Sequence, residues 1–114
     1  MARRMVAVTR ASEDAIAVLG NQIKAARARR AWTQADLAAR VGVTQKTMHA
    51  IESGSPSVSI GNVFNAAFTV GVNLFGLDGA DLARARRQGE ETLALLPARI
   101  RRPVTNDSAD DAAF

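Results

Sequence analysis

The stretch Thr33–Gly54, TQADLAARVGVTQKTMHAIESG, decides the fold of this chain. Its pattern predicts two short helices, at 34–40 and 45–53, joined by a tight turn. Gly42 stands between them, where the chain must reverse and where a left-handed backbone is least costly for glycine. Gly54 follows the second helix at the position where glycine commonly ends a helix.

Each of these helices has its own start signal. Thr33 is placed to cap the first helix, with Asp36 three residues later as its capping-box partner, and Thr44 is placed to cap the second. Two apolar pairs are spaced to clasp across these caps, Trp32 with Leu37 and Val43 with Met48.

The composition bounds the class of protein. With 114 residues, of which 47% are hydrophobic, the chain is long enough for one small domain with an appendage. It has no cysteine, which excludes disulfides and thiolate metal sites and is typical of cytosolic proteins. No apolar run approaches the roughly 20 residues that span a membrane, so we expect a cytoplasmic protein without a membrane partner.

The net charge of +4 is unevenly spread along the chain. All the arginines except Arg40 fall in four clusters: Arg3, Arg4 and Arg10; Arg27, Arg29 and Arg30; Arg84, Arg86 and Arg87; and Arg99, Arg101 and Arg102. Clustered arginine suits a polyanion partner such as nucleic acid. A GC-rich genome would also favour arginine over lysine, so charge alone leaves the partner open.

Three further helices are expected around the central pair, at about 14–31, 60–70 and 79–96. Ser12 is placed to cap the first of them, and Ser57 or Ser59 the second. The apolar face expected for the helix at 60–70 consists of Val63, Phe64, Ala67 and Phe68.

These elements divide the chain into four parts. We expect a flexible basic arm at 1–11, a helical body at 12–77, a dimerisation or partner helix at 78–97 and a flexible tail at 98–114. The tail is poor in large apolar residues and has little to bury. Its terminal Phe114 is either idle in solvent or an anchor for a partner.

The run VNLFGL at 72–77 is either an extended connector or a short strand. A lone strand leaves unpaired backbone groups, so a strand here would pair with the same segment of a second subunit. We expect the dimer or partner surface to consist of this run together with the apolar stripe of the helix at 79–96. The residues expected there are Val72, Leu74, Phe75, Leu77, Leu82 and Leu93.

Nothing in the sequence supports catalysis. The one histidine, His49, lies within a short helix, and the chain has no metal-binding motif, glycine-rich phosphate loop or carboxylate pair in an apolar setting. We therefore expect a protein that is not an enzyme and that uses no cofactor or metal.

The central pair of helices has the form of a helix–turn–helix unit, in which the second helix enters the major groove of DNA. The residues expected to contact DNA from that helix are Thr44, Gln45, Lys46, Thr47, His49 and Ala50. Gln45 can pair with adenine, Lys46 can reach guanine and Ala50 can contact a thymine methyl group. Gln34 opens the preceding helix and is expected to contact a backbone phosphate.

The same stretch resembles the phage-repressor and Cro-like helix–turn–helix family, also called the XRE family. The resemblance covers roughly 19–72 and rests on Leu19-Gly20, Ile23, Arg27, Thr33-Gln34, Leu37-Ala38, Gly42-Val43, Ile51-Glu52 and Gly54. It implies an all-α, five-helix, lambda-repressor-like domain that binds palindromic operator DNA as a homodimer associated with the nucleoid. It also implies a structural ion pair between Arg27 and Glu52.

A narrower resemblance comes from the run LPARIRRPV and the acidic ending DDAAF, which look like the ends of HipB-type antitoxins. It implies a repressor of its own operon that also neutralises a HipA-like kinase toxin. Two alternatives stay open. The chain is a stand-alone XRE-family regulator without a toxin, or it is an interaction module that keeps the fold without binding DNA.

Overall fold

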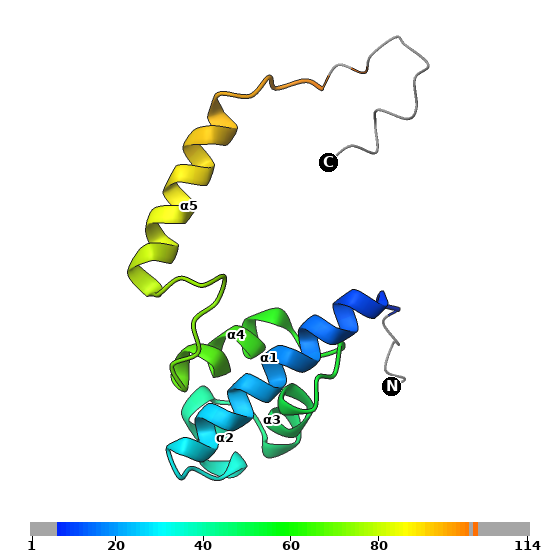
Figure 1. The fold of residues 1–114 in the computed structure, drawn as a ribbon, viewed down its shortest axis with the longest axis vertical. Helices are drawn as coiled ribbons and strands as arrows, with labels where there is room; N and C mark the ends of the chain where they lie inside the picture. Colours follow the sequence, from blue (N-terminus) through cyan, green and yellow to red (C-terminus); the bar gives the residue numbers. More distant parts are fainter. Residues whose placement is uncertain (1–6, 101, 103–114) are drawn as a thin grey trace. The chain divides into compact units, whose positions relative to one another are not determined.

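The computed structural model describes residues 7–100 and 102, and its helices confirm the all-α fold expected from the sequence. Over that part of the chain it contains α1 (Arg10–Arg29), α2 (Gln34–Val41), α3 (Gln45–Glu52), α4 (Ile60–Thr69) and α5 (Gly79–Ala94) (Figure 1). The chain divides into two compact units, at 1–79 and 80–114. Each is described by itself below.

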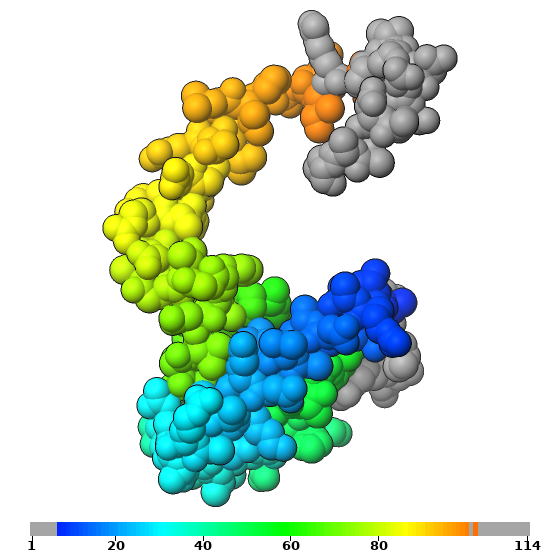
Figure 2. Space-filling model, viewed as in Figure 1, coloured from blue at the N-terminus to red at the C-terminus, as the bar shows by residue number. Residues whose placement is uncertain are grey.

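The first unit is built from four helices. α1 and α2 each pack against both α3 and α4 (Figure 1). The core is aliphatic, with Ile23, Leu37 and Met48 as its largest fully buried side chains. The remaining buried hydrophobic residues are Ala26, Ala38, Ile51, Ala66, Ala67, Val70 and Leu74. The space-filling view shows α1 (blue to light blue) exposed along one face of this unit (Figure 2).

α1 approaches the end of α3 closely because of Gly20. A Cβ atom added there would lie 2.8 Å from the carbonyl oxygens of Ile51 and Glu52. Since real Cβ atoms do not approach backbone oxygens so closely, any larger residue at this position would push α1 away from α3.

The caps predicted for α2, α3 and α4 are confirmed. The Asp36 N–H donates to Thr33 Oγ1 (3.0 Å) and the Thr33 N–H donates to Asp36 Oδ2 (2.8 Å), which completes the capping box of α2. The hydrogen bond from the Thr33 backbone holds the pKa of Asp36 below its usual value. Thr44 caps α3 and Ser59 caps α4. Gly42 adopts the left-handed conformation expected of it, with φ 87°.

The boundaries of α1 differ from the prediction. The helix begins at Arg10 because Thr9, and not Ser12, is its N-cap: Thr9 Oγ1 accepts a hydrogen bond from the Ser12 N–H at 3.1 Å. The arm that the sequence placed at 1–11 is therefore helical at Arg10 and Ala11, and residues 1–6 lie outside the described residues. At the other end the helix stops at Arg29, because Ala31 turns into the left-handed region with φ 57°.

The segment 72–77 forms a tight turn and not the short strand that the sequence allowed. Phe75 (φ 57°) and Gly76 (φ 70°) are both left-handed, and the Leu77 N–H donates to the Leu74 carbonyl at 2.9 Å. Two positive φ values in succession define a type I′ turn, which closes the backbone on itself. Leu74 is only 6% exposed and belongs to the core, so its placement on a dimer surface was wrong.

The face assigned to α4 also needs one correction. Val63, Ala66, Ala67 and Val70 face or line the core, whereas Phe68 is 45% exposed and points away from it. Val63, Phe64 and Ala67 thus belong to the inner face as predicted, and Ala66 and Val70 take the place of Phe68 in it.

The second unit contains α5, none of whose residues is buried. Ion pairs join Arg84 to Asp81 and Arg86 to Glu90, the latter at 3.1 Å. α5 ends at Ala94, two residues before Leu96, where the prediction ended it. Most of the predicted tail at 98–114, with Phe114, lies outside the described residues. Among the helices of residues 7–100, none is long and apolar enough to cross a membrane.

Candidate nucleic-acid interface

The outer face of α3 is fixed by the two residues that anchor its inner face. Met48 and Ile51 are buried in the core. Because side chains three and four positions apart share one face of a helix, Lys46 lies opposite these two residues, whereas Gln45 and His49 lie at the border between the inner and outer faces. All three are exposed. The structure therefore presents a short row of hydrogen-bonding side chains on a rigidly seated helix.

The first turn of α3 is ordered by two threonines. Thr44 Oγ1 accepts a hydrogen bond from the Thr47 N–H at 3.1 Å, and it donates to Thr47 Oγ1 at the same distance. Thr44 is thus used to start the helix, and Thr47 is half-buried beside it. This pairing caps the start of α3, the end at which helices bind anions.

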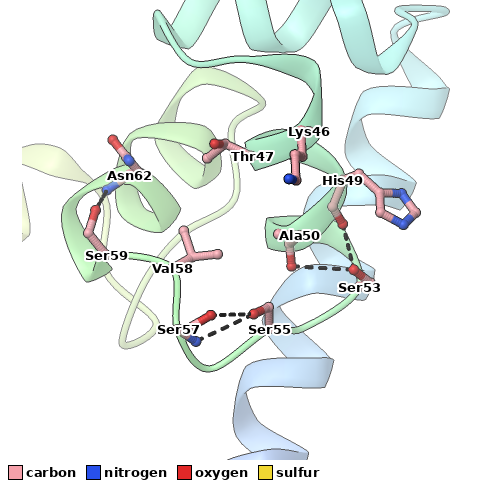
Figure 3. A pocket seen from close by; sticks show the side chains of 10 residues that line it. All are labelled: Lys46, Thr47, His49, Ala50, Ser53, Ser55, Ser57, Val58, Ser59 and Asn62. Atoms are coloured by element: carbon pink, nitrogen blue, oxygen red, sulfur yellow. Dashed lines mark hydrogen bonds between the residues drawn. The ribbon is translucent and has the colours of Figure 1, made fainter. Parts of the chain in front are cut away.

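A polar groove of about 470 Å³ runs beside α3 (Figure 3). One wall consists of Lys46, Thr47, His49, Ala50 and Ser53 from α3 and its end. The other consists of Ser55, Ser57, Val58, Ser59 and Asn62, from the loop and the start of α4. Figure 3 shows these two walls facing a common hollow, so α3 is bordered by a second polar surface.

The sequence analysis did not predict the serines of this second wall as site residues, although serines stand at alternate positions directly after α3. Ser55 Oγ and Ser57 Oγ lie 3.0 Å apart, and Ser53 Oγ donates to the His49 carbonyl at 2.6 Å. Ser59 Oγ accepts from the Asn62 N–H at 3.3 Å as it caps α4. The alternation of serines was the signal that could have predicted a hydroxyl-rich edge.

The ion pair of Arg27 and Glu52 is present and is bidentate. Arg27 Nε donates to Glu52 Oε2 (2.6 Å) and Arg27 Nη2 donates to Glu52 Oε1 (2.9 Å). Arg27 Nη1 donates to the Trp32 carbonyl at 2.7 Å. The pair thereby connects α1, the turn before α2 and the end of α3, which are the parts that set the angle between the two helices of the central unit.

The same carboxylate also binds Gln34. The Gln34 side-chain amide donates to Glu52 Oε1 at 3.1 Å, which holds this residue at the start of α2. Burial alone would raise the pKa of Glu52, but the hydrogen bonds from Arg27 and Gln34, with the charges of Arg27 and Lys24, lower it overall. The hydrogen bond to Glu52 raises the pKa of Arg27. Glu52 is therefore ionised at neutral pH and keeps both partners in place.

Trp32 lies between two arginines at the turn before α2. The guanidinium carbons of Arg30 and Arg40 are 5.2 Å and 4.0 Å from the centre of its ring. Arg30 Nε also donates to the Val70 carbonyl at 3.2 Å. These contacts close the turn against α4 and leave positive charge near α2. Within residues 7–100 and 102, no group of three or more His, Asp or Glu side chains is arranged to bind a metal ion.

Two short capped helices around a left-handed glycine, with an exposed row of polar side chains on the second, define the helix–turn–helix class of DNA-binding domains. Over residues 18–85 the chain matches the family model described as "Helix-turn-helix domain", and it belongs to that family, which is of the XRE/Cro-like type. The assignment indicates a DNA-binding regulator, and domains of this family are generally not enzymes. No curated protein and no solved structure matches the chain.

Proposed function

We propose that the chain is a transcriptional repressor that binds a palindromic operator as a homodimer and reads its sequence with α3. The observation that carries this proposal is the outer face of α3, where Gln45, Lys46 and His49 are exposed on a helix anchored by buried residues. A helix seated in this way presents fixed donors to base edges, as major-groove reading requires.

Each exposed residue of α3 has a chemical role in this proposal. Gln45 pairs with adenine through its amide, Lys46 donates to guanine, and Ala50 offers its methyl group to thymine. His49 and Thr47 flank them at the edge of the polar groove. Thr44 caps the start of the helix through the Thr47 N–H, and this end of α3 is the one suited to lie near a phosphate.

Phosphate contacts on both sides of α3 set the position of the helix in this proposal. Gln34, held by Glu52 at the start of α2, contacts the backbone on one side. The hydroxyl groups of Ser55, Ser57 and Ser59 line the opposite side of the groove and are suited to bind phosphate oxygens.

The test is direct. An operator is selected from a random duplex pool with the full chain, and the dissociation constant is measured by fluorescence anisotropy at fixed salt. Changing Gln45 and Lys46 together to alanine should weaken operator binding by more than about tenfold and relax the base preference at the positions that they read. The matched control changes Gln22 and Lys24 of α1, which removes the same residue types elsewhere and should leave affinity near wild type. Equal affinity of the two double variants would refute the reading role of α3.

We further propose that this repressor is the antitoxin of a HipA-like kinase operon. The resemblance of LPARIRRPV and DDAAF to the ends of HipB-type antitoxins supports it. The exposed aliphatic residues near the end of α5 also support it, because Leu93 and Leu95 are 67% and 86% exposed and offer a surface for a partner protein.

A HipA-like kinase encoded beside this chain should form a stable complex with it, and deletion of residues 98–114 should abolish that complex without abolishing operator binding. A neighbouring gene of another kind, or a kinase that ignores the chain, would favour a stand-alone regulator. Operator binding distinguishes the antitoxin and the stand-alone regulator from an interaction module, which would keep the fold without binding DNA.

A further inference from the structure

The chain between Glu52 and Asp78 has no charged residue, although charged residues make up 23% of the sequence. This segment includes the whole of α4, whose inner face supplies Ala66 and Ala67 to the core. A helix at the surface of a small protein ordinarily carries charged side chains on the face away from the core. The exposed side of α4 is uncharged instead, with Asn65 beside the large apolar residues Ile60 and Phe68.

Ile60, Phe64 and Phe68 follow one another at intervals of four, so they lie along one side of α4. Ile60 is 68% exposed and Phe68 is 45% exposed. Phe75 extends this surface, since its ring meets the ring of Phe64 edge-on, with centroids 6.3 Å apart. We name these four residues the α4 face.

Phe75 is held in an unfavourable state in the isolated chain. It is 78% exposed, and its φ of 57° lies in the left-handed region, which bulky residues rarely adopt. Asparagine and glycine are the residues that type I′ turns prefer at this position. A partner that buries Phe75 would compensate for both the strain and the exposed ring.

An apolar groove of about 290 Å³ adjoins the α4 face. Ile16 and Leu19 of α1 form one side and Val63 and Phe64 of α4 form the other. Phe64 belongs to both features, because it lines the groove and contacts Phe75. A protruding aromatic ring and an apolar hollow therefore both adjoin Phe64.

We infer that the α4 face is the homodimer interface, covered by a second copy of this chain related by a two-fold axis. In such an interface the same patch meets itself, and residues near the axis lie beside their own copies. A charged residue there would face its like, so the lack of charge from Glu52 to Asp78 suits a self-contact. A partner recognised through charge would find no counter-charge on this surface.

The inference rests on the proposed function, which needs two copies to occupy the two half-sites of a palindrome. The arrangement leaves α3 accessible. The polar groove beside α3 and the apolar groove are separate hollows that share only Ser55 and Val58, on the loop between the helices. A second copy on the α4 face can therefore assemble while α3 remains free to bind DNA.

The first test is sedimentation equilibrium of the full chain without DNA. Wild type should be a dimer, and Phe75→Asn and Phe68→Asn should each raise the dimer dissociation constant by more than about tenfold. Val18→Asn is the matched control, because Val18 is 53% exposed on α1 and lines neither groove. It should dimerise as wild type does.

The melting temperature gives a second test, because a variant that fails to dimerise only because it is misfolded would melt lower than wild type and not higher. At concentrations where both are monomeric, Phe75→Asn should melt higher than wild type, because asparagine tolerates the left-handed backbone. The wild-type melting temperature should rise with concentration, and that of Phe75→Asn should not.

A monomeric wild type, or a dimer that both Phe75→Asn and Phe68→Asn leave intact, would overturn the inference. If the dimer survives both substitutions and wild type still binds the operator, the proposed function stands and only the α4 face is excluded as the dimer interface. Conversely, dimers that the variants dissociate, in a chain that binds no duplex from the random pool, would support the interface and refute the proposed function.

Discussion

Replacing Glu52 with alanine should destabilise the four-helix unit by about 3 kcal/mol. The Glu52 side chain is 2% exposed and accepts hydrogen bonds from Arg27 Nε, Arg27 Nη2 and the Gln34 amide. Without the carboxylate, Arg27 keeps only the bond to the Trp32 carbonyl among these contacts. Breaking a buried ion pair from one side costs about 3–5 kcal/mol, since the remaining charge is left uncompensated.

The expected cost lies at the lower end of that range because the Arg27 side chain is 13% exposed and can regain some hydration. For a domain of this size, about 3 kcal/mol corresponds to a fall in melting temperature of about 12–24 °C. Circular dichroism during thermal and urea unfolding at pH 7 measures both quantities. Glu13→Ala is the matched control, since it removes an exposed carboxylate from the first turn of α1 and should cost less than about 1 kcal/mol.

The double variant Arg27→Met with Glu52→Leu completes the test. Replacing both charges with apolar side chains of similar size removes the uncompensated charge, so the double variant should be more stable than Glu52→Ala alone. A cost for Glu52→Ala no larger than that for Glu13→Ala would refute the reasoning, because it would mean that the pair contributes as little as a surface ion pair.

Three further predictions follow from the same structure. Because Glu52 has a lowered pKa in the folded chain, its contribution to stability is present above its unfolded pKa of about 4.3 and is lost as the pH falls through the lower folded value. The stability difference between wild type and Glu52→Gln, measured by urea unfolding, should therefore be smaller at acid pH than at pH 7. Gly20→Ala should destabilise the unit by about 1–3 kcal/mol, because its Cβ would meet two carbonyl oxygens, and an unchanged urea midpoint would contradict the packing of α1 on α3. Deleting residues 98–114 should leave the melting temperature of the four-helix unit unchanged, and a large fall would show that the tail is structural.

The parts of the fold that the sequence predicted well are those set by local chemistry. Thr33 with Asp36, Thr44 and Gly42 act within one turn of where they stand, so their roles follow from spacing alone. The start of α1 was harder to place, because Thr9 and Ser12 are both good caps three residues apart. Local chemistry does not decide which of the two residues caps the helix. That choice depends on tertiary packing and on the whole length of the helix.

The features that were missed depend on how elements face one another. The outward position of Phe68 depends on how α4 packs on the core, and the left-handed turn at Phe75 contradicts the usual preference of a bulky residue. The serine wall became part of the candidate site only because the loop after α3 folds back beside Lys46. The periodicity of the sequence predicts the faces of one helix at a time. It does not predict how one helix or loop packs against another.

The central claim is that α3 reads DNA with Gln45 at its leading end, and one measurement tests it most directly. The affinity of wild type and Gln45→Ala should be compared at matched salt on the selected operator and on its single-base variants. The account predicts a loss of about 1–3 kcal/mol on the operator and a relaxed preference at one base position in each half-site. Unchanged affinity together with an unchanged base preference would contradict it.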